Sequence, residues 1–111
     1  MEEELQIYID GKFYPKSEAK ISVFDHSILY GDAIFEGLGV INGIIFNLRQ
    51  HIDRLFQGAQ FLRIQIPMSK EEIMKAVVET CKVNGMKDGY IRLEVTRGVG
   101  KMGLDPRNCP K

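Results

Sequence analysis

The stretch from Ala33 to Ile41, followed directly by Asn42-Gly43, restricts the fold of this chain more than any other feature. The stretch is mostly apolar and follows no helical period, which predicts a strand buried on both faces. Asn-Gly is a strong signal for a two-residue hairpin turn, so the chain is expected to return along residues 44–46. The centre of the fold is therefore predicted to be an antiparallel hairpin.

The residues before this hairpin predict a second, smaller one and a tight turn. Residues 5–9 alternate between apolar and polar and run into Asp10-Gly11, with a return strand over 12–14 that stops at Pro15. Residues 25–32 predict a turn or a single helical turn that closes at a glycine.

A helix is expected after the central hairpin. Asn47 is predicted to be its N-cap, with Gln50 three residues on as the partner of a capping box. Arg54, His51 and Gly58 lie together on one face of this helix. A different face carries the apolar stripe that predicts core contact, namely Leu48, Ile52, Leu55, Phe56, Ala59 and Leu62.

A second helix and a last strand complete the pattern. Ser69 and Glu72 predict another capping box, and the helix is expected to end near Asn84-Gly85, with an apolar face of Ile73, Ala76, Val77, Thr80 and Cys81. Residues 90–96 alternate as a strand, so Tyr90 and Arg92 share one face of the sheet. These elements predict an α+β fold with a mostly antiparallel sheet and two main helices.

Length and charge limit the classes of protein that this chain can belong to. The chain has 111 residues, which fits a single domain over 1–111. Its formal net charge is zero, so electrostatics offers no reason to expect nucleic acid as a partner. No apolar run approaches the length of a membrane span, and the acidic first residues do not resemble a signal peptide. We therefore expect a cytoplasmic protein that does not enter a membrane.

Three features could carry chemistry. Gly37 and Gly39 point to one face of the central strand, which indicates close approach of a ligand, a bulge, or tight packing under a helix. The guanidinium of Arg54 suits a phosphate, although a solvated surface arginine is the ordinary alternative. Tyr90 and Arg92 could hold a carboxylate between them, or Arg92 could simply neighbour Glu94 on a solvent-facing strand.

Several other kinds of site are not expected. The glycine-rich residues 98–103 follow a strand, but no helix opens after them, which argues against a nucleotide phosphate loop. His26 and His51 have no partner at metal-ligand spacing, so both are expected to be structural and no metal site is predicted. Cys81 is expected to be a core residue.

Three blocks of sequence resemble the class IV transaminase family. They are DHSILYGDAIFEG at 25–37, HIDRL at 51–55, and YIR at 90–92 with TRG at 96–98 and GLDP at 103–106. The similarity runs from about residue 7 to the end of the chain. The resemblance implies the small N-terminal domain of a fold-type IV pyridoxal-phosphate enzyme that works as a homodimer.

The resemblance also implies roles for individual residues. Arg54 is similar to the arginine that holds the cofactor phosphate. Tyr90 and Arg92 resemble the carboxylate-recognising pair of the branched-chain aminotransferases. The remaining substrate-binding positions that the resemblance implies are Tyr30, Phe35 and Gly37 in the pocket wall, and Met102 and Leu104 in a loop that reaches the partner's pocket.

The family's Schiff-base lysine lies on a second domain, and neither Lys101 nor Lys111 stands in the setting expected for it. The chain alone is therefore expected to be inactive, and its parent is expected to exchange amino groups between Leu, Ile or Val and 2-oxoglutarate. An aminodeoxychorismate lyase, another class IV transaminase, or a non-catalytic binding or dimerisation module are the alternatives. D-amino-acid transaminases place a histidine in the later loop, and no histidine follows His51.

Two departures from the branched-chain pattern concern substrate choice: Gly39 stands where an arginine is frequent, and an aromatic common near Ile41 is missing. The sequence also predicts an apolar surface that would meet the second domain and a partner subunit. Its expected members are Ile34, Phe35, Leu38 and Leu104.

Overall fold

The computed structural model describes residues 4–99. In chain order, its strands, helices and one short 3-10 helix (η1) are β1 (Gln6–Ile9), β2 (Lys12–Pro15), η1 (Lys16–Glu18), α1 (His26–Tyr30), β3 (Ala33–Ile41), β4 (Ile44–Ile45), α2 (Leu48–Leu62), α3 (Lys70–Val83) and β5 (Gly89–Thr96). This order confirms the predicted α+β fold, and β3 has the bounds that the sequence indicated. Met102 and Leu104 fall outside the described residues.

The main sheet has the order β4-β3-β5, and both pairings are antiparallel. The turn between β3 and β4 has φ values of 53° at Asn42 and 75° at Gly43, as a two-residue turn of the predicted kind requires. β5 pairs with β3 along almost its whole length, from Ala33 opposite Thr96 to Val40 opposite Gly89. β4 pairs only with Val40 and Ile41, so β3 forms no ladder along most of that edge within residues 4–99.

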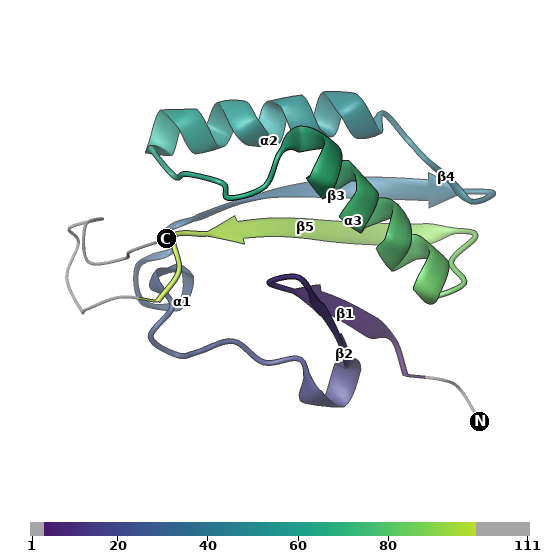
Figure 1. Cartoon of the computed structure of the whole chain (residues 1–111), viewed down its shortest axis with the longest axis horizontal. Helices are drawn as coiled ribbons and strands as arrows, with labels where there is room; N and C mark the ends of the chain where they lie inside the picture. Colours follow the sequence, from purple (N-terminus) through teal and green to yellow (C-terminus); the bar gives the residue numbers. More distant parts are fainter. Residues whose placement is uncertain (1–3, 100–111) are drawn as a thin grey trace.

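Helices α2 and α3 cover one face of this sheet (Figure 1). Alternation along β3 turns Leu38 and Val40 toward the helices, and both are buried. They pack with residues from α2, α3 and β5 in one core cluster, whose other buried members are Ile52, Ile73, Val77, Cys81 and Ile91. The buried positions of both helices therefore come from the apolar stripes that the sequence predicted.

Among residues 4–99, nothing buries the opposite face of β3, so the prediction of a strand buried on both faces is wrong. Phe35, on that face, is 54% exposed, and Ile41 is also exposed. The predicted apolar surface is correct at Phe35 but wrong at Leu38, which is 0% exposed because it faces the helices. A run of apolar residues does not say whether a second layer is present within the same chain.

The two predicted capping boxes have different outcomes. At α3, the Ser69 hydroxyl accepts from the Glu72 amide, and the Glu72 carboxylate accepts from the Ser69 amide, which confirms that box. At α2, Asn47 has a φ of 51° and makes no side-chain cap hydrogen bond. A capping side chain needs an extended backbone at the N-cap, and the left-handed conformation of Asn47 does not supply it.

The β1–β2 hairpin forms its own two-stranded sheet beside α3. The side chain of Asn84, at the end of α3, joins this helix to β1. Its Oδ1 accepts from the Gln6 amide at 2.7 Å, and its Nδ2 donates to the Gln6 carbonyl at 3.0 Å. The side-chain amide of Asn84 thus pairs with the backbone of β1 as a neighbouring strand would.

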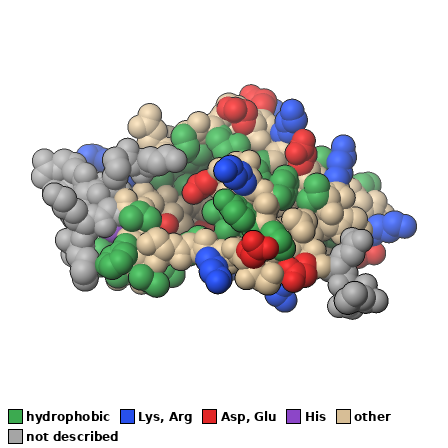
Figure 2. All heavy atoms as spheres, turned by 60° about the horizontal axis from the view of Figure 1, so that its bottom comes forward, with side chains coloured by type: hydrophobic (Ala, Val, Ile, Leu, Met, Phe, Trp, Pro, Cys, Tyr) green, Lys and Arg blue, Asp and Glu red, His purple; other side chains and the backbone are tan. Residues whose placement is uncertain are grey.

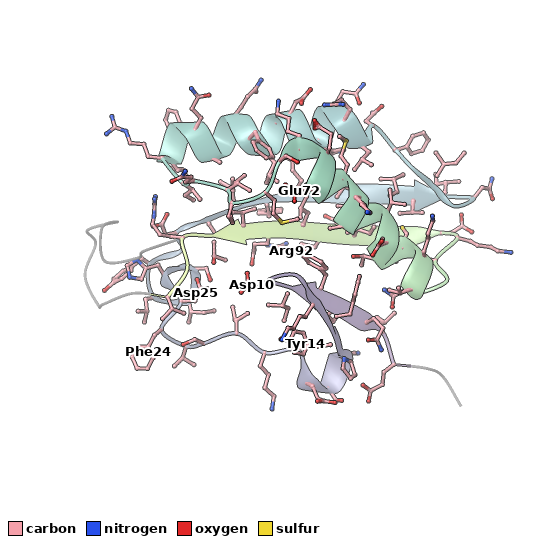
Figure 3. All side chains as sticks on the ribbon, viewed as in Figure 1. Asp10, Tyr14, Phe24, Asp25, Glu72 and Arg92 are labelled. Atoms are coloured by element: carbon pink, nitrogen blue, oxygen red, sulfur yellow. The ribbon has the colours of Figure 1, made fainter. Side chains whose placement is uncertain are left out.

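α1 is the predicted single helical turn, closed by Gly31 in the left-handed conformation. Asp25 caps it by accepting from the Ser27 amide, and its second oxygen accepts from the Thr96 hydroxyl at 3.0 Å. Asp25 therefore lies where α1 meets the end of β5 (Figure 3). Across the described residues, no helix is long and apolar enough to cross a membrane.

Candidate functional site

The predicted site residues come mainly from β3 and β5. The pairing register sets Phe35 opposite Glu94 and Gly37 opposite Arg92, so these side chains share the uncovered face of the sheet. Arg92 projects from β5 in the direction away from α2 and α3 (Figure 3). Tyr90, two residues earlier, is on the same face. The structure therefore brings Phe35, Gly37, Tyr90 and Arg92 together.

Tyr90 fills the space above Gly37. A Cβ placed on Gly37 would overlap the Tyr90 hydroxyl and would lie 2.6 Å from Cζ of its ring. A Cβ on Gly39 would meet nothing within 4 Å. The group that approaches Gly37 is thus a side chain of the neighbouring strand, which is none of the three interpretations that the sequence left open for the paired glycines.

Arg92 has two neighbours on this face. Its guanidinium carbon lies 4.0 Å from the centroid of the Phe35 ring, within the range of a cation–π contact. Its Nη2 donates a hydrogen bond to Oε1 of Glu94, and these two atoms lie 3.2 Å apart. Both Arg92 and Glu94 are exposed, so this ion pair adds little to stability. The guanidinium of Arg92 thus stacks on Phe35 and pairs with Glu94, on the sheet face that also carries Tyr90.

Arg54 projects from α2 toward the other face of β3, where it meets Glu36. Its Nε donates to both carboxylate oxygens, at 3.2 and 2.9 Å, and its Nη2 donates to Oε1 at 2.8 Å. The His51 Nδ1 lies 2.6 Å from the same Oε1. An ionised carboxylate can only accept, so Nδ1 carries the hydrogen. One buried carboxylate is thus shared by two side chains of α2.

Hydrogen bonds from Arg54 hold the pKa of Glu36 below its ordinary value of 4.5, although burial opposes this shift and His51 assists it. The same pairing raises the pKa of Arg54. Glu36 is therefore ionised at neutral pH. Arg54 uses only its Nε and one Nη2 hydrogen on Glu36, and its remaining donors lie on a side chain that is 68% exposed.

Tyr30 lies at the end of α1, with its ring edge-on to the buried ring of His26 at 5.0 Å between centroids. His26 is thus a core residue of the α1 junction. Within residues 4–99, no three His, Cys, Asp or Glu side chains form a group that could hold a metal ion.

Sequence reasoning missed two charged residues that organise this region. Glu36 is 6% exposed, and a carboxylate on the same face as Leu38 and Val40 is a signal that a cationic partner lies nearby. Arg97 is also buried and pairs with Asp32 at 2.6 Å. Asp32 directly precedes β3 and Arg97 directly follows β5. Because Ala33 pairs with Thr96, the antiparallel register alone would place Asp32 and Arg97 side by side.

Arg97 also holds the end of α2. Its Nη2 donates to the Leu62 carbonyl at 2.7 Å, and its Nη1 donates to the Arg63 carbonyl at 3.0 Å. These carbonyls are at the helix C-terminus, where backbone acceptors have no partner within the helix. One side chain therefore ties α2 to both long strands.

The fold, the group on the exposed face of β3 and the Glu36–Arg54 pair on its other face point to a known family of proteins. The profile of the family described as amino-transferase class IV matches residues 33–111, so the chain belongs to the class IV aminotransferase family. A putative branched-chain-amino-acid aminotransferase of Methanocaldococcus jannaschii is 54% identical over 107 residues, which are 96% of this chain and 37% of that protein.

Solved structures show the same fold. The T.th. branched-chain amino acid aminotransferase, complexed with N-(5'-phosphopyridoxyl)-L-glutamate, is 33% identical with a TM-score of 0.84, over 96% of this chain and 37% of that one. The Escherichia coli branched-chain amino acid aminotransferase has a TM-score of 0.88 at 28% identity, over 95% of this chain and 37% of that one. The chain thus spans a little over a third of the length of these proteins.

Proposed function

We propose that this chain is the small N-terminal domain of a longer two-domain enzyme. The enzyme exchanges amino groups between leucine, isoleucine or valine and 2-oxoglutarate with pyridoxal phosphate. The observation that carries the proposal is the uncovered sheet face on which Tyr90 and Arg92 stand over Gly37 and Phe35. The identity to branched-chain aminotransferases supports the substrate class. The free, buried thiol of Cys81 fits the cytoplasmic setting that we propose.

Arg54 fits the role of cofactor phosphate ligand. A planar guanidinium suits a phosphate, and the donors that Glu36 does not occupy are exposed. Bound pyridoxal phosphate would supply the carbonyl and the electron-accepting ring that amino transfer requires. Because β3 forms no ladder at this edge within residues 4–99, a ligand lying across the edge could reach Arg54 on one side and the Tyr90 face on the other.

The uncovered face fits a substrate that joins a carboxylate to an apolar or acidic side chain. Tyr90 offers a hydroxyl and Arg92 a guanidinium, and together they can bind a carboxylate by charge-assisted hydrogen bonds. Phe35 supplies apolar contact, with Tyr30 as a further part of the wall. We propose that Met102 and Leu104, outside the described residues, complete the pocket of a partner subunit in a homodimer.

The test uses the full-length enzyme with pyridoxal phosphate, leucine and 2-oxoglutarate, and glutamate formation is the expected result. Arg92→Ala should raise the KM for 2-oxoglutarate by about tenfold and the KM for leucine much less, because only the dicarboxylate offers a second anion. Glu94→Gln is the matched control, since it removes the ion pair of Arg92 but keeps the guanidinium.

Three outcomes would contradict parts of this proposal. Equal damage to both substrates would mean that Arg92 holds the α-carboxylate or only supports β5. Product release without an amino acceptor would indicate a lyase of the same family. A native reading frame that ends at Lys111, with no affinity for pyridoxal phosphate, would indicate a binding or dimerisation module.

A further inference from the structure

Glu36 is an unusual residue for its position in the core. It lies on the helix-facing side of β3 with Leu38 and Val40, and it is 6% exposed. Burying an ionised carboxylate is costly, and a buried ion pair is weak evidence for stability in its own right. Its partner Arg54 is mostly exposed, which weakens the pair further as a source of stability. The placement of Glu36 therefore calls for a reason in addition to holding the fold together.

The geometry of the pair supplies such a reason. Glu36 occupies the side of the guanidinium formed by Nε and Nη2, and hydrogen bonds at 2.9 and 2.8 Å fix the plane of the group. Of the five N–H donors of Arg54, both on Nη1 and one on Nη2 remain. These donors form the end of the guanidinium, which can take a second anion in a bidentate manner while Glu36 stays in place.

His51 fixes the carboxylate in turn. It lies one turn before Arg54 on α2, and its Nδ1 donates to Oε1 of Glu36 at 2.6 Å. The same oxygen accepts from Nη2 of Arg54. The carboxylate is thus held from two points of one helix, and a planar group with two such contacts has little rotational freedom.

Two roles for Glu36 can be compared. If Glu36 competed with a phosphate for Arg54, its oxygens would occupy the end of the guanidinium, where Nη1 and Nη2 donate. They occupy the side instead, where Nε and Nη2 donate. We propose that Glu36, supported by His51, is a positioning residue that orients Arg54 toward the phosphate of the cofactor. This inference rests on the proposed function, in which Arg54 holds that phosphate.

The experiment is a double-mutant cycle on the full-length enzyme, with the Kd for pyridoxal phosphate measured by equilibrium dialysis. Arg54→Ala should weaken binding most. Glu36→Gln should raise the Kd by about tenfold, within the range of coupling between contacting residues. In the Arg54→Ala background, Glu36→Gln should change the Kd by less than about twofold, because it acts through the guanidinium.

A stability control separates positioning from a structural role. Leu38→Ala creates a cavity on the same face of β3 and should lower the Tm, yet leave the Kd within about twofold. His51→Phe removes the donor to Glu36 and should raise the Kd in the same direction as Glu36→Gln. It also serves as the second variant if Glu36→Gln does not fold.

The possible outcomes distinguish this inference from the function on which it rests. An unchanged Kd in Arg54→Ala would overturn the phosphate role of Arg54, and the positioning role with it. Weaker binding in Arg54→Ala with an unchanged Kd in both Glu36→Gln and His51→Phe would overturn the positioning role alone. Tighter binding in Glu36→Gln would show that Glu36 competes with the phosphate. An equal effect of Glu36→Gln in both backgrounds would show that it does not act through Arg54.

Discussion

Single charged side chains fix the spatial relation between α2 and the strands of this domain. Glu36 binds Arg54 and His51 of α2 from β3, and Arg97 binds the last carbonyls of the same helix from the end of β5. Each is buried and each satisfies partners on a separate element, so its position is strongly determined. The sequence pointed to Arg54 but not to Glu36. The two residues are 18 positions apart, so their pairing depends on how α2 packs on β3.

At residue scale, the position of the Tyr90 ring depends on the missing side chain of Gly37. Gly37→Ala in the full-length enzyme should push the hydroxyl of Tyr90 aside, since the added Cβ would overlap it. The strand gains roughly 0.5–1 kcal/mol from replacing glycine by alanine, and the far end of the Tyr90 side chain can move, so the Tm should change little. The KM for leucine should rise severalfold.

Gly39→Ala is the matched control for Gly37→Ala. It lies on the same face of the same strand, but its Cβ would meet nothing within 4 Å, so both the Tm and the KM should stay close to those of the wild type. Wild-type kinetics in Gly37→Ala would show that the position of Tyr90 above Gly37 has no part in substrate binding.

The stability of the chain in acid depends on the carboxylate of Glu36. The folded state holds the pKa of Glu36 below the ordinary 4.5, chiefly through its hydrogen bonds from Arg54. The unfolded state therefore binds the proton more readily. The stabilisation from ionised Glu36 is fully present above pH 4.5 and is lost as the pH falls through the lower, folded value.

Urea unfolding of the wild type and Glu36→Gln at several pH values measures this contribution. The difference in unfolding free energy should be largest above pH 4.5 and should shrink as the solution becomes more acidic. In an Arg54→Ala background the difference should be smaller at every pH above that value. A difference that grows on acidification would refute the assigned direction of the pKa shift.

At element scale, local sequence signals predicted what depends on backbone conformation. The bounds of β3, both hairpin turns and the capping box of α3 came from residues within each element. The start of α2 could not be predicted in this way. Asn47 must first turn the chain from β4, and that turn places it in the left-handed region. Burial on the uncovered face of β3 also failed, since it depends on whether another layer packs there.

The two helix starts provide a prediction about capping. Ser69→Ala removes both the hydroxyl acceptor for the Glu72 amide and the basis of the capping box, and should cost about 0.5–2 kcal/mol in unfolding free energy. Asn47→Gly should cost no more than a few tenths of a kcal/mol, because Asn47 makes no side-chain cap bond and glycine tolerates its positive φ. Denaturant unfolding of both variants checks the ranking. A greater loss from Asn47→Gly would mean that its side chain has a role that the structure does not show.

At the scale of the whole molecule, exposed apolar side chains occur around α1 and on the face of the main sheet opposite α2 and α3. Exposed apolar side chains are frequent before and within α1, at Ile21, Val23, Phe24 and Ile28, in addition to Phe35 on the sheet. Figure 2 shows hydrophobic side chains at this surface between mixed acidic and basic ones. Such a surface is typical of a domain that meets another domain or subunit. The sequence predicted this exposure at Phe35 but not in residues 21–28, where the pattern is irregular.

The last prediction follows from this surface. The 111-residue chain by itself should fold, and light scattering should show dimers or larger assemblies, because exposed apolar side chains favour self-association. The double substitution Val23→Ser with Phe24→Ser should shift the distribution toward monomer with little change in Tm, since both side chains are exposed and Phe24 points away from the sheet (Figure 3). Phe61→Ser is the matched control: Phe61 is 87% exposed on α2, remote in sequence from residues 21–28, and its loss should leave the assembly unchanged. A monodisperse monomer for the wild-type chain would refute association through this surface, and an equal shift from Phe61→Ser would show that association is unspecific.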